Sequence, residues 1–182
     1  MSIEVVPWSA AWTRDFELVA AQLRPALGRI PGARVEHVGS TSVTGLAAKP
    51  ILDVDVIVDR ADVPAAVAAL VGIGYAHRGD LGVVGREAFF PPDPLPRRNV
   101  YVCESGTMPV RNHLAVRDVL RADDELRDAY AAVKLSLASD PAVDIDAYIA
   151  RKSAVVQRVL EVSGEFTDDE LAAIRRLNDP GA

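Results

Sequence analysis

The sequence predicts an α+β protein in which a sheet-containing half is followed by a helical half. Between residues 34 and 103, short apolar runs are separated by turns rich in glycine, serine and proline, and one helical segment lies between two of these runs. From about residue 111 onward, apolar residues recur at helical spacing. No linker rich in proline, glycine or serine separates the halves, so we expect the helices to pack on the sheet and to wall one side of a cleft.

The expected elements follow from local patterns and turn residues. The first helix follows Ser9, carries a core-facing stripe and has Pro25 as a kink or an early end; the stripe is Trp12, Phe16, Val19, Leu23 and Leu27. Strands are expected at 34–38, 51–58, around Tyr75 and at 99–103, and a short helix at Asp62. Later helices are expected through Leu120, through about Leu137, over 144–162 and after Thr167.

Length and composition predict one globular domain. A chain of 182 residues with 49% hydrophobic residues can bury one good core. Within the domain 1–182 we assign 1–110 to the sheet-containing half, 111–165 to the helical half and 166–182 to a C-terminal helix and tail. No secretory signal pattern and no apolar run near the roughly 20 residues that span a bilayer is present, which predicts a cytoplasmic protein without membrane contact.

Charge and cysteine content narrow the function classes. A net charge of -6 and a pI of about 5.1 argue against a surface that attracts nucleic acid or anionic membranes. The single cysteine, Cys103, excludes an internal disulfide and a thiolate zinc cluster, and its apolar surroundings predict a buried structural thiol. The three histidines are scattered and do not form a zinc motif.

The predicted strand at 51–58 contains the residues that most clearly indicate a functional site. Side chains alternate between faces along a strand, so Asp53 and Asp55 share one face while the opposite face is wholly aliphatic. Burying two carboxylates beside a core costs several kcal/mol each unless a cation or a cleft receives them. We therefore predict that both aspartates bind Mg²⁺ and are catalytic; salt bridges to Lys49 or to arginines of the helical half are the structural alternative.

The turn before this strand supplies groups that bind phosphate. Gly39 allows close approach of the backbone, Ser40 and Ser42 offer short hydroxyl donors, and Lys49 adds a positive charge. An ordinary tight turn with capping hydroxyls is the alternative. His37 either orients a phosphate or a metal-bound water near this turn, or is a structural histidine.

The helical half offers further cations. Tyr130 and Lys134 are four residues apart, as are Tyr148 and Lys152, so each pair shares a helix face that we expect to grip a polyanionic substrate. A solvated cationic face is the alternative. Arg117 is expected at the same site, or in an ion-pair network with the neighbouring Asp118.

Two other segments have simpler interpretations. His113 begins a helix beside Asn112, where capping is the simpler role. The loop from Gly79 to Arg86 has several glycines, but it matches neither a P-loop nor a dinucleotide fingerprint. We interpret it as a hairpin-like connection or a mobile flap, in which Arg86 is a weaker candidate for substrate contact.

The segment VEHVGSTSVTGLAAKPILDVDVIV closely resembles the signature of the GrpB family, whose fold is similar to that of the nucleotidyltransferase superfamily. The resemblance continues through PWSAAW, GDLGVVGRE, HLAVRDVLR, ELRDAYAAVK and DIDAYIARK, in the family's order, and covers most of the chain. It implies a mixed sheet of about five strands with helices and a cleft that handles a nucleotide or another phosphorylated small molecule.

In one respect the sequence differs from the active members of the nucleotidyltransferase superfamily. Active members usually have a third carboxylate on a neighbouring strand, and the expected strand at 99–103 has no acidic residue before Glu104. Glu104, Glu87 and Asp80 are the candidate substitutes. We therefore expect either Mg²⁺-dependent nucleotidyl or phosphoryl transfer, or a non-catalytic accessory module that assists a metabolic kinase such as dephospho-CoA kinase. A nucleotide-dependent RNA-modifying enzyme is a weaker third hypothesis, opposed by the acidic pI.

Overall fold

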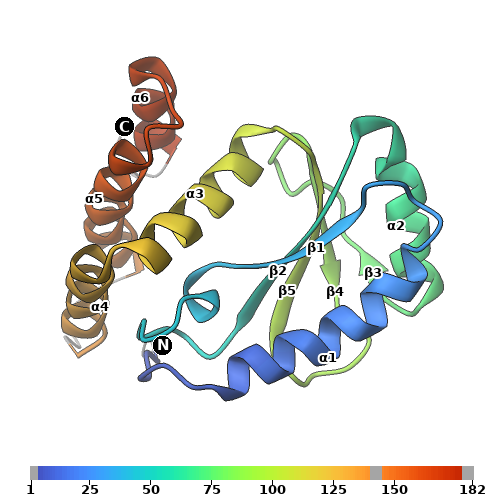
Figure 1. Ribbon diagram of the computed structural model, residues 1–182, viewed down its shortest axis with the longest axis horizontal. Helices are drawn as coiled ribbons and strands as arrows, with labels where there is room; N and C mark the ends of the chain where they lie inside the picture. Colours follow the sequence, from blue (N-terminus) through green and yellow to red (C-terminus); the bar gives the residue numbers. More distant parts are fainter. Residues whose placement is uncertain (1–3, 140–144, 178–182) are drawn as a thin grey trace.

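The computed structural model describes residues 4–139 and 145–177, and over these residues a five-stranded mixed sheet lies between two groups of helices (Figure 1). The spatial strand order is β1-β2-β5-β4-β3, with β2 and β5 parallel and every other neighbouring pair antiparallel. The strands are β1 (Arg34–Val38), β2 (Leu52–Val58), β3 (Ala76–His77), β4 (Arg86–Phe90) and β5 (Arg98–Glu104). The predicted α+β class is confirmed.

The helices follow the predicted order. They are α1 (Ala11–Ala26), α2 (Val63–Gly72), α3 (Met108–Ala122), α4 (Asp124–Ser139), α5 (Ile145–Ser163) and α6 (Asp168–Leu177), with short 3-10 helices η1 (Ser40–Ser42) and η2 (Arg60–Asp62). The Ser9 hydroxyl accepts the Ala11 N–H, and Pro25 lies in the last turn of α1. No strand was expected at 86–90, yet this segment forms β4, which joins β3 to β5. The loop before it is the predicted hairpin connection.

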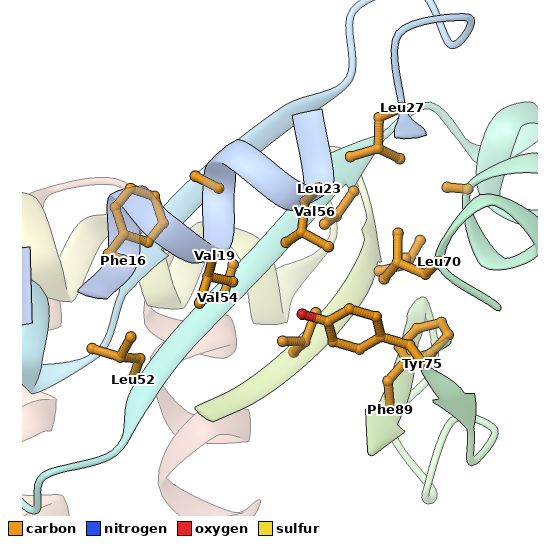
Figure 2. Packing of buried hydrophobic residues seen from close by; sticks show 14 of the residues in the cluster. Phe16, Val19, Leu23, Leu27, Leu52, Val54, Val56, Leu70, Tyr75 and Phe89 are labelled. Atoms are coloured by element: carbon orange, nitrogen blue, oxygen red, sulfur yellow. The ribbon is translucent and has the colours of Figure 1, made fainter. Parts of the chain in front are cut away.

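The main core lies between the sheet and the helices α1 and α2 (Figure 2). The predicted stripe on α1 is confirmed, since all five of its members are buried. They pack against the aliphatic face of β2, which consists of Leu52, Val54, Val56 and Val58. This packing turns the opposite face of β2, with its two aspartates, away from the core.

We expect Leu23→Ala to lower the free energy of unfolding by about 2–5 kcal/mol, because it removes a fully buried side chain and leaves a cavity. Leu18→Ala, on the exposed side of the same helix, is the matched control and is expected to stay within about 0.5 kcal/mol of wild type. Urea unfolding followed by circular dichroism measures both. Equal losses in the two variants would contradict this assignment of the core face.

The second face of the sheet meets the helical half, which begins at Met108. Val110 of α3 packs on Ile57 and Cys103 at the far end of this face. Farther along, α3, α4 and α5 form a separate apolar cluster with the loop after η1, made of Val43, Leu46, Leu120, Tyr130 and Val159. A cavity remains between the sheet and these helices. None of the described helices has the length and apolar character needed to cross a membrane.

Candidate functional site

The strand β2 brings Asp53 and Asp55 to one face, as predicted, at a cavity of about 940 Å³. Asp53 lines this cavity, and one of its oxygens accepts a hydrogen bond of 2.8 Å from Asn99 Nδ2 on β5. Burial raises the pKa of Asp53, although the hydrogen bond from Asn99 opposes the rise. A carboxylate held in this way is stabilised by any cation that reaches the cavity.

Asp55 is completely buried and pairs with a histidine that the sequence analysis assigned to capping. His113 Nδ1 lies 2.7 Å from Asp55 Oδ2, whereas Asp55 Oδ1 has no hydrogen-bond partner in the described part of the chain. Burial disfavours the imidazolium, but the hydrogen bond to Asp55 and the charges of both aspartates outweigh it and raise the pKa of His113. His113 lines the cavity, whereas Asp55 lies behind the lining residues.

The Gly-Ser turn between β1 and β2 closes against Asp53. Gly39 has φ 67° and ψ -174°, a conformation almost restricted to glycine, and a Cβ there would overlap Oδ2 of Asp53. Ser42 Oγ donates a hydrogen bond of 2.6 Å to the Gly39 carbonyl and so holds the turn. Gly39 and Ser40 line the cavity, but Ser42 does not. The turn therefore offers Ser40 to a ligand and uses Ser42 for its own structure.

All three lysines of the chain gather around this part of the cavity, although every other cationic side chain is an arginine. Lys49 and Lys152 line the cavity. Lys134 is only 3% exposed and lies with its Nζ 5.2 Å from the ring centre of Tyr130, a lining residue. Burial, followed by the charge of Lys152, lowers the pKa of Lys134 to about 7. A compact, strongly hydrated ammonium is an expensive group to bury without an anion.

Two predicted site residues lie elsewhere. His37 is on the core face of β1, stacked on Phe16 at 4.6 Å and within 3.0 Å of the Thr41 hydroxyl, and burial lowers its pKa to about 4. These contacts support its structural alternative. Arg117 donates to Glu36 at 2.8 Å and to Asp118 at 2.7 Å, which is the ion-pair network. Neither residue lines the cavity. Tyr148 is in α5, but its side chain lies outside the described residues.

On β5 the positions beside the aspartates hold no carboxylate, whereas on β1 Glu36 aligns with Asp55 and forms an ion pair with Arg117. In the β2–β5 register, Asp53 faces Asn99 and Asp55 faces Tyr101. Glu104 and Glu87 align with Val58 and Val102, so both point to the other side of the sheet. Asp80 accepts the Gly82 N–H within its own loop. The three substitutes considered from the sequence are therefore not directed at the acidic pair.

No group of three or more His, Cys, Asp and Glu side chains arranged to hold a metal occurs within residues 4–139 and 145–177. Mg²⁺ does not need such a cage, because it commonly binds one or two carboxylates together with water and substrate phosphates. Cys103 lies below the site, where burial and the charge of Asp55 raise its pKa far above the ordinary value. It is the buried structural thiol that the sequence predicted.

The sheet order, the acidic pair on β2 and the Gly-Ser turn before it define a protein with a nucleotidyltransferase-like fold. A crystal structure of the Cid1 poly(U) polymerase with MgGTP bound matches with a TM-score of 0.53 at 17% identity, over 71% of this chain and 43% of that chain. At that identity the likeness shows the fold alone.

The chain belongs to the GrpB family, whose model, described as GrpB protein, matches residues 2–162. A UPF0157 protein of Halalkalibacterium halodurans is 36% identical over 162 residues, covering 88% of this chain and 82% of the relative. The crystal structure of the conserved protein GrpB from Enterococcus faecalis matches with a TM-score of 0.73 at 31% identity, over 89% of this chain and all of that chain. A dephospho-CoA kinase of Mycolicibacterium paratuberculosis is 28% identical over 82% of this chain and 43% of its own length.

Proposed function

We propose that this protein binds a nucleoside triphosphate, or a similar phosphorylated small molecule, together with Mg²⁺ and transfers its nucleotidyl group to a small acceptor. The observation that carries the proposal is the meeting of Asp53, Lys49 and Lys152 at one cavity, with Lys134 buried within electrostatic reach of all three. A cavity that brings a carboxylate and ammonium groups together suits a ligand that is itself a metal-bound polyanion.

The lysines suit the phosphate chain of such a ligand. Lys134 is buried with a pKa near 7, so a phosphate beside it restores the stable charged form. Lys49, Lys152 and the Ser40 hydroxyl face the same cavity and add charge and a hydrogen-bond donor. A nucleoside triphosphate therefore places its β- and γ-phosphates at these residues and its α-phosphate near Asp53.

The two aspartates fit Mg²⁺ by their donor type and by one unsatisfied atom. Oδ1 of Asp55 is buried without a hydrogen-bond partner in residues 4–139 and 145–177, and Asp53 reaches the cavity directly, so these carboxylates would hold the ion. When bound, Mg²⁺ neutralises charge on the phosphates. Asp55 is in turn oriented by its contact with His113.

The reaction is a displacement at phosphorus. An acceptor hydroxyl oxygen forms a bond to the α-phosphorus, the bond from that phosphorus to the bridging oxygen breaks, and pyrophosphate leaves with the bonding electrons. The hydroxyl proton passes to water. The lysines stabilise the leaving pyrophosphate, and Ser40 with the neighbouring turn holds the triphosphate in position.

The first test is a thermal-shift and calorimetry series with ATP, GTP, CTP and UTP, each with and without Mg²⁺. We expect a Mg²⁺-dependent rise in melting temperature for wild type, equivalent to about 2.7 kcal/mol at a ligand concentration 100 times Kd. Asp53→Asn keeps the shape and the Asn99 contact but is expected to weaken binding at least tenfold. Glu87→Gln, on the opposite side of the sheet, is the control and should bind as wild type. Wild type without any shift, or an unaffected Asp53→Asn variant, would contradict the proposal.

A second candidate, a nucleotide-binding accessory module without catalysis, is favoured by one observation. Asn99 and Tyr101 occupy the positions of β5 beside the aspartates, where we expected the third carboxylate that active superfamily members usually carry on a neighbouring strand. The related dephospho-CoA kinase suggests a partner of that class. Nucleotide binding without pyrophosphate release, together with binding to purified dephospho-CoA kinase, would select this candidate over the enzyme.

A further inference from the structure

Arg86 lies at the end of the cavity away from the lysines and has no polar partner among the described residues. Its guanidinium carbon lies 4.6 Å from the ring centre of Tyr101, and the side chain lines the cavity. Nε is buried and has no hydrogen bond, and no carboxylate among the described residues forms an ion pair with this side chain. Stacking on the ring fixes the plane of the guanidinium and leaves its N–H groups to be satisfied by something else.

The other partly buried arginines show how this chain usually satisfies such a group. Arg98 binds Asp93 through two nitrogens and also donates to Tyr75. Arg117 binds Glu36 and Asp118, and Arg121 donates twice to the Ser42 carbonyl. A buried N–H without a partner loses its hydrogen bond to water and gains none in return, which destabilises the protein. Arg86 differs from these arginines because its guanidinium has no protein acceptor among the described residues and lines a cavity. A ligand oxygen in that cavity would supply the acceptor.

The sheet register places Arg86 opposite the lysines across the acidic pair. Arg86 aligns with Cys103, which aligns with Ile57, so Arg86 shares the face of the aspartates. At about 3.3 Å per residue, the level of Ile57 is roughly 13 Å along the strand from Asp53. Lys49 precedes β2 and lies at the other end. In an in-line displacement the attacking and leaving oxygens are on opposite sides of the phosphorus, so a pyrophosphate at the lysines requires an acceptor from the Arg86 side.

We propose that the Arg86 end of the cavity is the acceptor subsite, and that it binds a carboxylate or phosphate group on a small molecule that also carries a hydroxyl. The assignment of this end to the acceptor rests on the proposed nucleotidyl transfer. The binding of an anion to Arg86 does not depend on that reaction. A guanidinium of fixed orientation matches the two oxygens of either anion. Thr107 and Asn112 add polar groups to the lining here, and Val83, Val84 and Met108 add apolar contacts for a short carbon skeleton.

The test compares three-carbon alcohols that differ only in their anionic group. Glycerol 3-phosphate, glycerate and glycerol are titrated into wild type, Arg86→Gln and Arg78→Gln by calorimetry, with thermal unfolding as a check of folding. Arg78 is the matched control, because it also stacks on an aromatic ring, Phe90, but is exposed outside the cavity. We expect at least one charged alcohol to bind wild type and Arg78→Gln at least tenfold more tightly than Arg86→Gln, and glycerol not to bind. The tighter of the two charged probes identifies phosphate or carboxylate as the natural group.

The outcomes separate this subsite from the proposed function. Arg86→Gln is expected to keep its Mg²⁺-dependent nucleotide binding, because the triphosphate lies at the other end. Arg86-dependent anion binding in a protein that binds no nucleotide would support the subsite and overturn nucleotidyl transfer. If a charged probe binds Arg86→Gln and wild type with equal affinity, its anionic group binds at the lysines, and the proposed subsite is overturned. Failure of both charged probes to bind wild type would also overturn it.

Discussion

Lys134→Met is expected to make the protein more stable and, at the same time, to weaken nucleotide binding at least tenfold. The ammonium of Lys134 is buried on α4 against Tyr130, and no carboxylate in the described part of the chain forms an ion pair with it. Methionine fills a similar volume without the charge. Replacing a buried charge with an apolar side chain of similar size often stabilises a protein, and we expect a gain of about 1–3 kcal/mol at pH 7.

The pH dependence of this gain identifies its cause. The pKa of Lys134 is about 7 in the folded protein and near 10.5 in the unfolded chain, so between these values the unfolded state binds more protons. The free energy of unfolding of wild type therefore rises with pH through this window, and the penalty of the buried lysine is fully present below pH 7. The advantage of Lys134→Met should thus be largest at or below pH 7 and should vanish toward pH 10.

Two further measurements make the assignment specific to the ligand. A polyphosphate beside Lys134 raises its pKa, so nucleotide binding at pH 7–8 should take up protons, which calorimetry detects in buffers of different ionisation enthalpy. Lys152→Met is the matched control: its side chain is less buried, so the variant should bind nucleotide more weakly without becoming more stable. If Lys134→Met is destabilised and binds nucleotide normally, Lys134 is a structural residue and the phosphate assignment is wrong.

The features of the site that were predictable are those encoded within one short segment. The acidic pair follows from strand periodicity, and Gly39, Ser40 and Lys49 are within 16 residues of Asp55 in the sequence. The absence of an acidic residue before Glu104 on β5 was likewise visible, because the segment has the pattern of a regular strand. Local sequence determined these features, and the GrpB resemblance determined the fold to which they belong.

The rest depended on contacts between distant segments. His113 meets Asp55 across 58 residues, and nothing in the helical pattern of α3 marks it. The role of His37 depended on which face of β1 meets α1, since a strand with a polar residue on each face leaves that choice open. Arg86 lies in a strand that follows a glycine-rich loop and begins with two charged residues, so neither β4 nor its face was apparent. For these residues the relevant information is the sheet register, which arises only in the folded chain.

Gly39→Ala is the other substitution with a large expected effect, and it should reduce both stability and nucleotide binding. At φ 67° and ψ -174° an alanine is strained by about 1–3 kcal/mol. Its Cβ would also overlap Oδ2 of Asp53 and lie 3.0 Å from Cγ, so the carboxylate must leave its position beside Asn99. We expect a loss of about 3 kcal/mol or more in the free energy of unfolding, and Mg²⁺-dependent nucleotide binding at least tenfold weaker.

Gly32→Ala separates the two causes. Gly32 also has a positive φ, 71°, but a Cβ there meets nothing within 4 Å, so its substitution reports backbone strain without a clash. Urea unfolding and calorimetry with Mg²⁺ and nucleotide are measured on both variants. Gly32→Ala should lose stability only, within the strain range of about 1–3 kcal/mol, and bind nucleotide as wild type. If Gly39→Ala likewise kept full nucleotide affinity, the position of Asp53 would not matter for binding, and the metal would have to be held without it.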